Sequence, residues 1–280
     1  MKGRRAGTSG GIAGTAARPR RRQALALAGA ARIIGSLTAE ACGGHAVTRL
    51  SWRGLAGWLL LGAVSFGALA GDAGPAHWKP DIDAFAAGDR AQAPATRGVL
   101  FIGSSSVRLW TTLAADFPGV PVIDRGFGGS TIADATYYAD RIVWPYQPRL
   151  IVMYAGDNDI AAGVAPAQVL AAFRAFVARA RQGVPGVPVV YVSIKPSLAR
   201  LPLWPSMKEA NERIRAWAIT QQDVRFVDIA PAMTDAQGRP RAELFRPDGL
   251  HMTPAGYALW VAALKPVLAE YGFAAGPPAQ

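Results

Sequence analysis

Residues 150–159, LIVMYAGDND, contain the pattern that decides the fold. The first five of them are all apolar, and an unbroken apolar run of this length is typical of a strand buried on both faces of a sheet. Four comparable runs occur elsewhere, namely VLFI (99–102), PVID (121–124), VPVVYVSI (187–194) and RFVDI (225–229). The chain is therefore expected to form about five strands.

Longer amphipathic segments separate these strands. Helical spacing of apolar residues, together with helix start signals, marks the segments 106–115, 131–142, 166–182, 206–221 and 254–271. Strands that alternate with helices form a parallel sheet covered on both faces. We predict a three-layer α/β/α sandwich, flavodoxin-like, over residues 98–273, followed by a flexible tail at 274–280.

The positive charge of the chain is concentrated before this domain. Residues 1–53 carry ten Lys and Arg side chains and one acid, whereas residues 54–280 carry 20 basic and 18 acidic side chains. A nucleic-acid-binding domain needs basic side chains clustered on one face. The net charge of +11 therefore does not indicate a nucleic-acid partner.

Cysteine and histidine are scarce. Cys42 is the only cysteine in the sequence, which excludes an intramolecular disulfide and a thiolate metal cluster. Of the three histidines, only His77 and His251 follow residue 70. A mechanism that uses histidine in the predicted domain therefore has two candidates.

Residues 54–70, GLAGWLLLGAVSFGALA, form an uncharged apolar run. Arg49 and Arg53 precede this run, and it ends in Ala68-Leu69-Ala70. This arrangement is typical of a secretory signal peptide cleaved after Ala70, and an uncleaved signal anchor is the alternative. We expect an exported protein, periplasmic or secreted, that contacts the membrane only transiently or through that anchor.

The remainder of the N-terminal region, 1–70, is less regular. Residues 1–46 are rich in Gly, Ala and Arg; they either extend the targeting region or are not translated, since a start at Val47 would leave an ordinary signal peptide. Residues 71–97 mix Pro, Gly and Ala with a short helical stretch near 81–89. They are predicted to form a lead-in arm.

Ligands of open parallel sheets bind at the carboxyl ends of the strands, so the loops there matter most. The first strand ends in Gly103-Ser104-Ser105-Ser106, where a serine can face a ligand or can make a plain turn and helix cap. The second strand ends in RGFGGST (125–131). Its glycines allow a ligand to approach the backbone, or they form a flexible crossover.

Two further loops carry polar side chains. Asn158 can donate an amide N–H to an oxyanion, whereas its neighbours Asp157 and Asp159 can make turns and caps. Asp248 and His251 lie three residues apart in FRPDGLHMTP (245–254). Such a pair can act as a proton relay, with the carboxylate holding the histidine tautomer, and a structural histidine is the alternative.

Taken together, the four loops resemble the sequence blocks of the SGNH hydrolase superfamily, also called GDSL esterases and lipases. The resemblance spans residues 99–271, and its motifs follow the order of the family. They are GSS (103–105), GFGG (126–129), GDND (156–159) and DGLH (248–251). The resemblance implies the SGNH hydrolase fold.

It also implies a role for individual residues. Ser105 would be the nucleophile, His251 the general base and then acid, and Asp248 the orienting carboxylate. The oxyanion hole would consist of the Ser105 and Gly129 N–H groups and the Asn158 side-chain amide. No metal and no organic cofactor is implied.

The chain departs from the family at one position. Ser104 stands where the family has the Asp of Gly-Asp-Ser, which leaves three consecutive serines as candidates for the nucleophile. We assign Ser105 because it occupies the family's nucleophile position, and we interpret Ser106 as the helix cap.

The implied activity is hydrolysis of carboxylic esters, with short acyl groups favoured, through an acyl-enzyme. An acyltransferase on the same site is one alternative, and a catalytically idle carbohydrate-binding domain is another. A flavodoxin-like nucleotide binder would share the fold but would leave Asp248 and His251 without a role.

The substrate is expected to be a small-molecule or glycan ester. Lys195 and Arg200 follow the fourth predicted strand and are candidates for binding an anionic or sugar-bearing substrate, with solvated loop cations as the alternative. Trp110 is a candidate floor for an acyl or sugar pocket, with core packing as the alternative.

Overall fold

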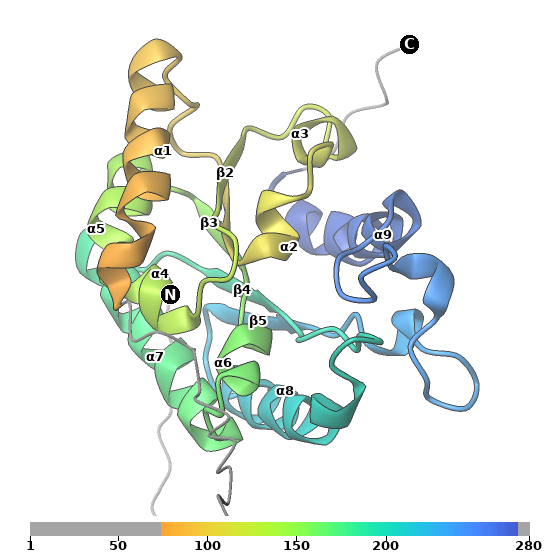
Figure 1. The fold of residues 1–280 in the computed structure, drawn as a ribbon. Helices are drawn as coiled ribbons and strands as arrows, with labels where there is room; N and C mark the ends of the chain where they lie inside the picture. The colour runs from red at the N-terminus through yellow and green to blue at the C-terminus, as the bar shows by residue number, and fades with distance from the viewer. Residues whose placement is uncertain (1–73, 274–280) are drawn as a thin grey trace, which may run out of the picture. The chain divides into compact units, whose positions relative to one another are not determined.

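Five parallel strands form one sheet in residues 74–273, the part of the chain that the computed structural model describes (Figure 1). The order of the strands is β2-β1-β3-β4-β5, and every neighbouring pair is parallel. Their bounds are β1 (Val99–Gly103), β2 (Val122–Gly126), β3 (Leu150–Tyr154), β4 (Val189–Val192) and β5 (Val224–Val227). The predicted α/β fold is confirmed.

Helices cover both faces of this sheet (Figure 1). One face carries α1 (Lys79–Ala91), α4 (Ile132–Tyr137), α5 (Ala139–Ile142), α7 (Pro166–Gly183) and α8 (Trp204–Ala218). The other face carries α2 (Ser105–Arg108), α3 (Leu113–Asp116) and α9 (Pro254–Glu270). The helix α6 (Asp157–Ala161) lies beyond the carboxyl end of β3. Short 3-10 turns occur at Pro75–Trp78, Trp144–Tyr146, Leu201–Leu203, Pro231–Met233 and Ala242–Leu244.

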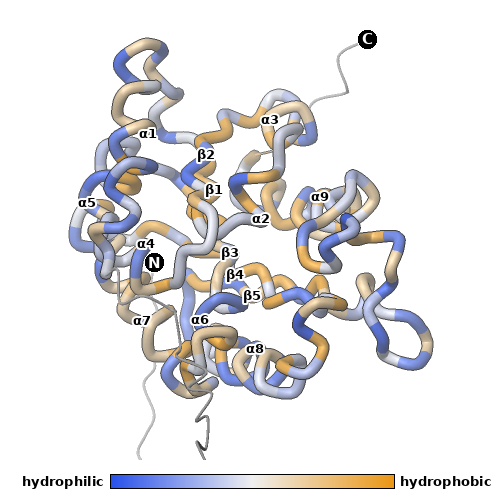
Figure 2. The backbone as a smooth tube through the Cα atoms, in the orientation of Figure 1, coloured by the Kyte–Doolittle hydropathy of each residue, from blue (hydrophilic) through white to orange (hydrophobic). Residues whose placement is uncertain are grey.

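Each face of the sheet has its own apolar core, because successive side chains of a strand point to opposite sides. In β1, Leu100 and Ile102 belong to the core under α7, whereas Val99 and Phe101 belong to the core under α9. Figure 2 shows the resulting concentration of hydrophobic residues along the central strands. The near-continuous apolar strands of the sequence are explained by this burial on two sides.

Trp110 is part of the second core and does not form a pocket floor. Its side chain is 2% exposed and stacks on Tyr257 with a ring-centroid distance of 5.0 Å. Trp260 also packs against Trp110 in a T-shaped arrangement, at 5.8 Å between ring centroids. The expectation of a substrate contact is therefore corrected to the alternative of core packing.

The predicted helix over 106–115 is two short helices, α2 and α3. Between them the chain turns, and the indole Nε1–H of Trp110 donates to Asp116 at 2.6 Å while the Thr112 hydroxyl donates to the same carboxylate at 2.7 Å. These side-chain bonds compete with continuation of the helix. The predicted helix over 131–142 is likewise divided, at Tyr138.

The described part of the lead-in arm packs onto the sheet domain. Its helix α1 buries Ile82 completely and is longer than the expected stretch at 81–89. Asp89 of this helix forms an ion pair with Arg125 of β2, with 2.5 Å between the charged atoms. The arm therefore contributes to the core of the domain rather than merely leading into it.

Several sequence predictions concern segments outside the described residues, namely the targeting region at 1–70 with its apolar run at 54–70, and the tail at 274–280. Between residues 74 and 273, no helix is long and apolar enough to cross a membrane.

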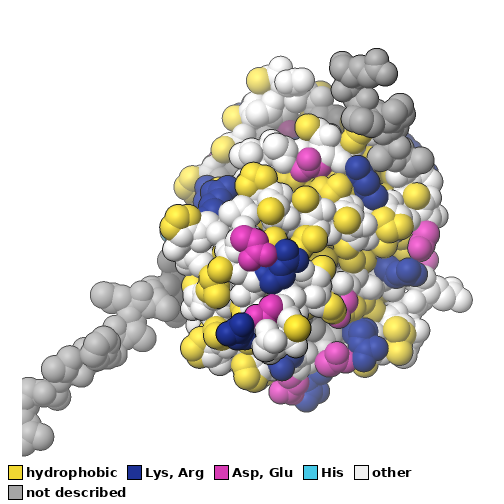
Figure 3. All heavy atoms as spheres, turned by 90° about the vertical axis from the view of Figure 1, so that its right-hand side faces the viewer, with side chains coloured by type: hydrophobic (Ala, Val, Ile, Leu, Met, Phe, Trp, Pro, Cys, Tyr) yellow, Lys and Arg dark blue, Asp and Glu magenta, His cyan; other side chains and the backbone are white. Residues whose placement is uncertain are grey.

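Basic side chains on one side of the molecule lie beside acidic ones. Figure 3 looks onto the side that carries α9 and shows Lys and Arg interspersed with Asp and Glu. Ion pairs among the described residues include Arg225–Glu270, Arg239–Asp235 and Arg241–Glu243.

Gly103 ends β1 at a point where no side chain fits. Its φ is +147°, and an added Cβ atom would lie 1.8 Å from the carbonyl oxygen of Tyr154 in β3. The next residue, Ser104, donates its N–H to the same oxygen at 3.1 Å. This close approach allows the chain to turn directly from β1 into the loop of three serines.

Two loops at the carboxyl edge of the sheet are tied together by polar bonds. Both carboxylate oxygens of Asp159 lie 3.3 Å from the N–H of Ile132, the first residue of α4. The Asn158 side-chain amide donates to the Ser130 carbonyl at 2.9 Å. The loop after β2 and the loop after β3 therefore hold each other in place.

Substitution of Gly103 tests the close approach of β1 to β3. We expect Gly103→Ala to lower the free energy of unfolding by at least about 3 kcal/mol, because the new methyl group overlaps a buried carbonyl and the backbone has positive φ. Gly88→Ala is the control: it lies in α1 with open space around the added atom. The control should be neutral or stabilising by roughly 0.5–1 kcal/mol. Equal urea-unfolding curves for the two variants would contradict this explanation.

The pH dependence of stability in an Asp159 variant tests the contact between the two loops. Burial raises the pKa of the Asp159 carboxyl from its ordinary 3.8 to about 6. The folded protein thus binds this proton more tightly than the unfolded chain, and the resulting stability is lost as pH rises from about 4 to about 6. Urea unfolding across this range should show wild type losing roughly 1–3 kcal/mol relative to Asp159→Asn. If the free energies of unfolding of wild type and Asp159→Asn changed with pH in parallel, the raised pKa of Asp159 would be refuted.

Candidate active site

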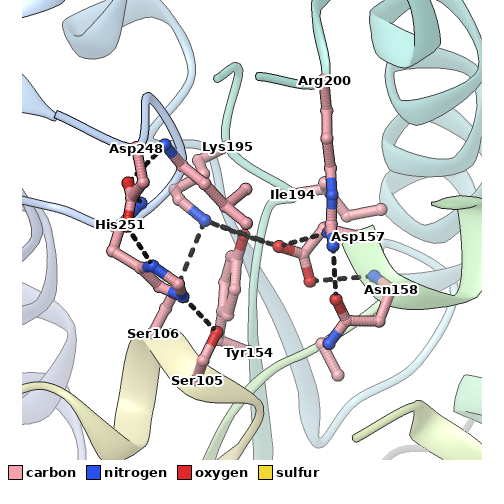
Figure 4. Close-up of polar contacts among 12 residues, drawn as sticks. Ser105, Ser106, Tyr154, Asp157, Asn158, Ile194, Lys195, Arg200, Asp248 and His251 are labelled. Atoms are coloured by element: carbon pink, nitrogen blue, oxygen red, sulfur yellow. Dashed lines mark hydrogen bonds and ion pairs between the residues drawn. The ribbon is translucent and has the colours of Figure 1, made fainter. Parts of the chain in front are cut away.

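The structure brings Ser105, His251 and Asp248 into one hydrogen-bonded chain (Figure 4). His251 Nε2 lies 3.0 Å from Ser105 Oγ, and His251 Nδ1 lies 2.7 Å from Asp248 Oδ2. A carboxylate can only accept, so Nδ1 carries the proton and Nε2 is left to accept from the serine hydroxyl. This arrangement allows the histidine to withdraw the serine proton.

Asp248 is held as a charged acceptor by its own loop. Its Oδ1 accepts the N–H groups of Leu250 and His251, each at 2.9 Å. Burial raises the pKa of this carboxyl, but the hydrogen bonds from the His251 ring and from the two N–H groups outweigh it and lower the pKa to about 2. Asp248 is therefore ionised at neutral pH and can stabilise a protonated imidazole.

The loop that carries this pair is fixed on both sides. Arg246 donates its N–H to the carbonyl of His251 at 2.7 Å, and Phe245 forms an antiparallel bridge with Met252. Thr253 then caps α9, accepting the N–H of Gly256 on its hydroxyl. His251 therefore projects from a short loop whose two ends are hydrogen-bonded to each other.

The three consecutive serines have different surroundings. Ser104 is fully buried, and its hydroxyl has no hydrogen-bond partner within residues 74–273. Ser106 is 1% exposed and accepts a hydrogen bond from Lys195. Ser105 alone is both partly exposed and bonded to His251. The expectation that Ser106 caps a helix is wrong, because α2 begins at Ser105 and Ser106 is its second residue.

Three donors face the same edge of the sheet. The N–H groups of Ser105, the first residue of α2, and of Gly129, in the loop after β2, make no hydrogen bond to other described residues. Gly129 has φ +85°, a conformation that favours glycine. The Asn158 amide has two hydrogens, and only one of them is used, by Ser130. These groups are available to an oxyanion.

Lys195 lies beneath the candidate site and not at its mouth. Its side chain is 1% exposed, and its ammonium lies 3.0 Å from both Ser106 Oγ and the Tyr154 hydroxyl. Burial lowers the pKa of Lys195, and the nearby Asp157 carboxylate, 3.5 Å away, opposes this effect. The expectation that Lys195 contacts substrate is corrected, because a buried ammonium cannot reach a bound ester.

Arg200 reaches into the site and contacts two side chains of the loop after β3. Its guanidinium lies 3.2 Å from Asp157 and donates to the Asn158 side-chain oxygen at 2.8 Å. The side chain is 19% exposed. Arg200, which was expected to bind substrate, therefore contacts the loop after β3.

Two residues near the site were not identified from the sequence. Trp78 of the arm lies against Gly129, since a Cβ atom on that glycine would be 3.1 Å from the indole. Asp157, interpreted as a turn or cap, is 4% exposed and pairs with two cations. Both contacts join segments that are distant in sequence, so no local pattern signals them.

A cleft of about 570 Å³ lies away from Ser105, His251 and Asp248, between α8 and the segment after β5. Its lining includes Trp204, Lys208, Phe226 and Asp228. Within residues 74–273, no group of three or more His, Cys, Asp or Glu side chains is arranged to hold a metal ion.

Comparison with known proteins identifies the family. Residues 83–259 match the model of the GDSL-like lipase/acylhydrolase family. No curated protein sequence matches the chain.

Solved structures share the fold. A protein from Streptococcus pneumonia, provisionally named a platelet activating factor, is 21% identical with a TM-score of 0.62, covering 69% of this chain and 94% of its own. A GDSL-like lipase from Bacteroides thetaiotaomicron is 21% identical with a TM-score of 0.59, covering 68% and 98%. An acetylxylan esterase from Geobacillus stearothermophilus, solved as a catalytic mutant, is 16% identical with a TM-score of 0.52, covering 66% and 99%.

The family match covers more than half of the chain and contains all four loops that suggested the resemblance. The expected family and fold are confirmed, and membership supports ester hydrolysis in general. The chain belongs to the GDSL-like lipase/acylhydrolase family.

Proposed function

We propose that the protein is a serine esterase that hydrolyses small carboxylic esters through an acyl-enzyme. The observation that carries the proposal is the hydrogen-bonded chain from Ser105 through His251 to Asp248, with its partly exposed serine. The family to which the chain belongs is named for lipases and acylhydrolases, which supports the reaction class.

Acylation begins at Ser105. Its Oγ attacks the ester carbonyl as its proton passes to Nε2 of His251, and the Asp248 carboxylate stabilises the resulting imidazolium. The carbonyl oxygen becomes an oxyanion that accepts hydrogen bonds from the backbone N–H of Ser105, the backbone N–H of Gly129 and the free amide hydrogen of Asn158. His251 then gives its proton to the departing alcohol.

Deacylation uses the same groups. His251 takes a proton from water, the hydroxide attacks the acyl carbon, and the Ser105 oxygen leaves with a proton from His251. The acid product is released and the free serine is regenerated. Each oxyanion donor contributes a factor of ~10²–10³ to the rate of such reactions.

We favour a short acyl group for this site. The segment after β4 is joined to the histidine loop by a hydrogen bond from Ala199 N–H to the Gly249 carbonyl, at 3.0 Å. It exposes Leu198 and Leu201, which are 40% and 43% accessible. Two leucines give a small apolar surface, suited to a short acyl or alcohol group of a small-molecule or glycan ester.

The apolar run at 54–70 supports export of this esterase, to the periplasm or out of the cell, because its flanks and length are typical of a signal peptide. An uncleaved anchor would instead hold the enzyme at the membrane.

Ester hydrolysis by variants of the serine loop tests the proposal. We expect the full chain to hydrolyse p-nitrophenyl esters, fastest with short acyl groups, and Ser105→Ala to reduce kcat by ~10³-fold or more. Ser104→Ala is the matched control, since its hydroxyl is buried and unbonded within the described residues, and it should retain most activity.

Two results would contradict the proposal. Activity that survives Ser105→Ala but disappears with Ser104→Ala would reassign the nucleophile. A folded wild type without turnover on any ester of the series would favour the idle binding domain.

A further inference from the structure

The orientation of the Asn158 carboxamide is fixed from both ends. Its oxygen accepts a hydrogen bond from Arg200 Nη2 at 2.8 Å, and its nitrogen donates to the Ser130 carbonyl at 2.9 Å. A guanidinium can only donate and a carbonyl can only accept, so each partner permits one end of the amide. The remaining amide hydrogen is thereby directed away from both partners.

If the oxygen and nitrogen of the Asn158 side chain exchanged places, an esterase would lose stabilisation of its oxyanion. The oxygen and nitrogen of a carboxamide are nearly equal in size, so only hydrogen bonding distinguishes the two orientations. With Asn158 reversed, its side-chain oxygen would face the developing oxyanion and repel it. Arg200 is the group that opposes this reversal most strongly, because its bond to the amide oxygen is assisted by a full charge.

Arg200 is itself held by a buried acid. Its guanidinium lies 3.2 Å from Asp157 Oδ2, and the side chain of Asp157 is only 5% exposed (Figure 4). Lys195 lies 3.5 Å from the same oxygen. The pairing of this carboxylate with two cations compensates its burial and leaves the guanidinium positioned over Asn158.

We propose that Arg200 is a positioning residue, which holds the Asn158 carboxamide in the one orientation that presents an N–H to the oxyanion. This inference rests on the proposed esterase function. It replaces the expectation that Arg200 binds substrate, since Arg200 acts on the reaction through Asn158 alone.

A cycle of four proteins tests the inference: wild type, Arg200→Met, Asn158→Ala and the double variant. We expect Arg200→Met to lower kcat by ~10-fold or more with KM within about twofold of wild type. In the Asn158→Ala background the same change should alter kcat less than about twofold, because the group it positions is gone. Arg200→Lys, which restores one donor and the charge, should recover part of the loss.

Arg141→Met serves as the matched control. It removes an arginine that pairs with Asp83 of the arm at 2.8 Å, outside the active site, and should leave kcat unchanged. Urea unfolding of every variant shows whether a rate loss reflects a loss of folded protein, and Arg200→Lys extends the test if Arg200→Met does not fold.

The outcomes separate the inference from the proposed function. Equal kcat losses from Arg200→Met in both backgrounds would overturn the positioning role while the esterase stands. An increase in KM confined to anionic esters would overturn it in favour of substrate binding. A folded wild type without ester turnover would overturn both proposals.

Discussion

The position of β1 between β2 and β3 is the constraint on which the site depends. At its carboxyl end, Gly103 pairs with Gly126 on one side and with Tyr154 on the other. The chain leaves each of these strands at the same level of the sheet, so the loops after them become neighbours. A side chain at Gly103 would overlap the Tyr154 carbonyl and separate the end of β1, with Ser105, from the end of β3, with Asn158.

A group of charged side chains lies behind this edge. Asp157 and Lys195 are buried, and they form one network of ion pairs with the partly exposed Arg200. The network reaches α2 through the bond from Lys195 to Ser106, and it reaches Asn158 through Arg200. These contacts join the network to two loops at the carboxyl edge of the sheet.

The sequence predicted the strands and the order of the four loops, because burial on both faces and tight turns leave local patterns. It did not predict the burial of Lys195, and it left Trp110 open between a pocket floor and the core, since the direction of a side chain depends on packing against segments distant in the chain. The division of the helix expected at 106–115 arises from side-chain bonds to Asp116, which helical periodicity does not reveal. The contact of Trp78 with Gly129 was missed for the same reason as the burial of Lys195.

The central claim is that Ser105 becomes acylated, and trapping of the reactive serine tests it most directly. A fluorophosphonate reacts with an activated serine by forming an oxygen–phosphorus bond and releasing fluoride, which leaves a stable adduct that mass spectrometry can locate. We expect one adduct per chain, on Ser105. An adduct on Ser104 or Ser106, or an unmodified folded protein, would contradict it.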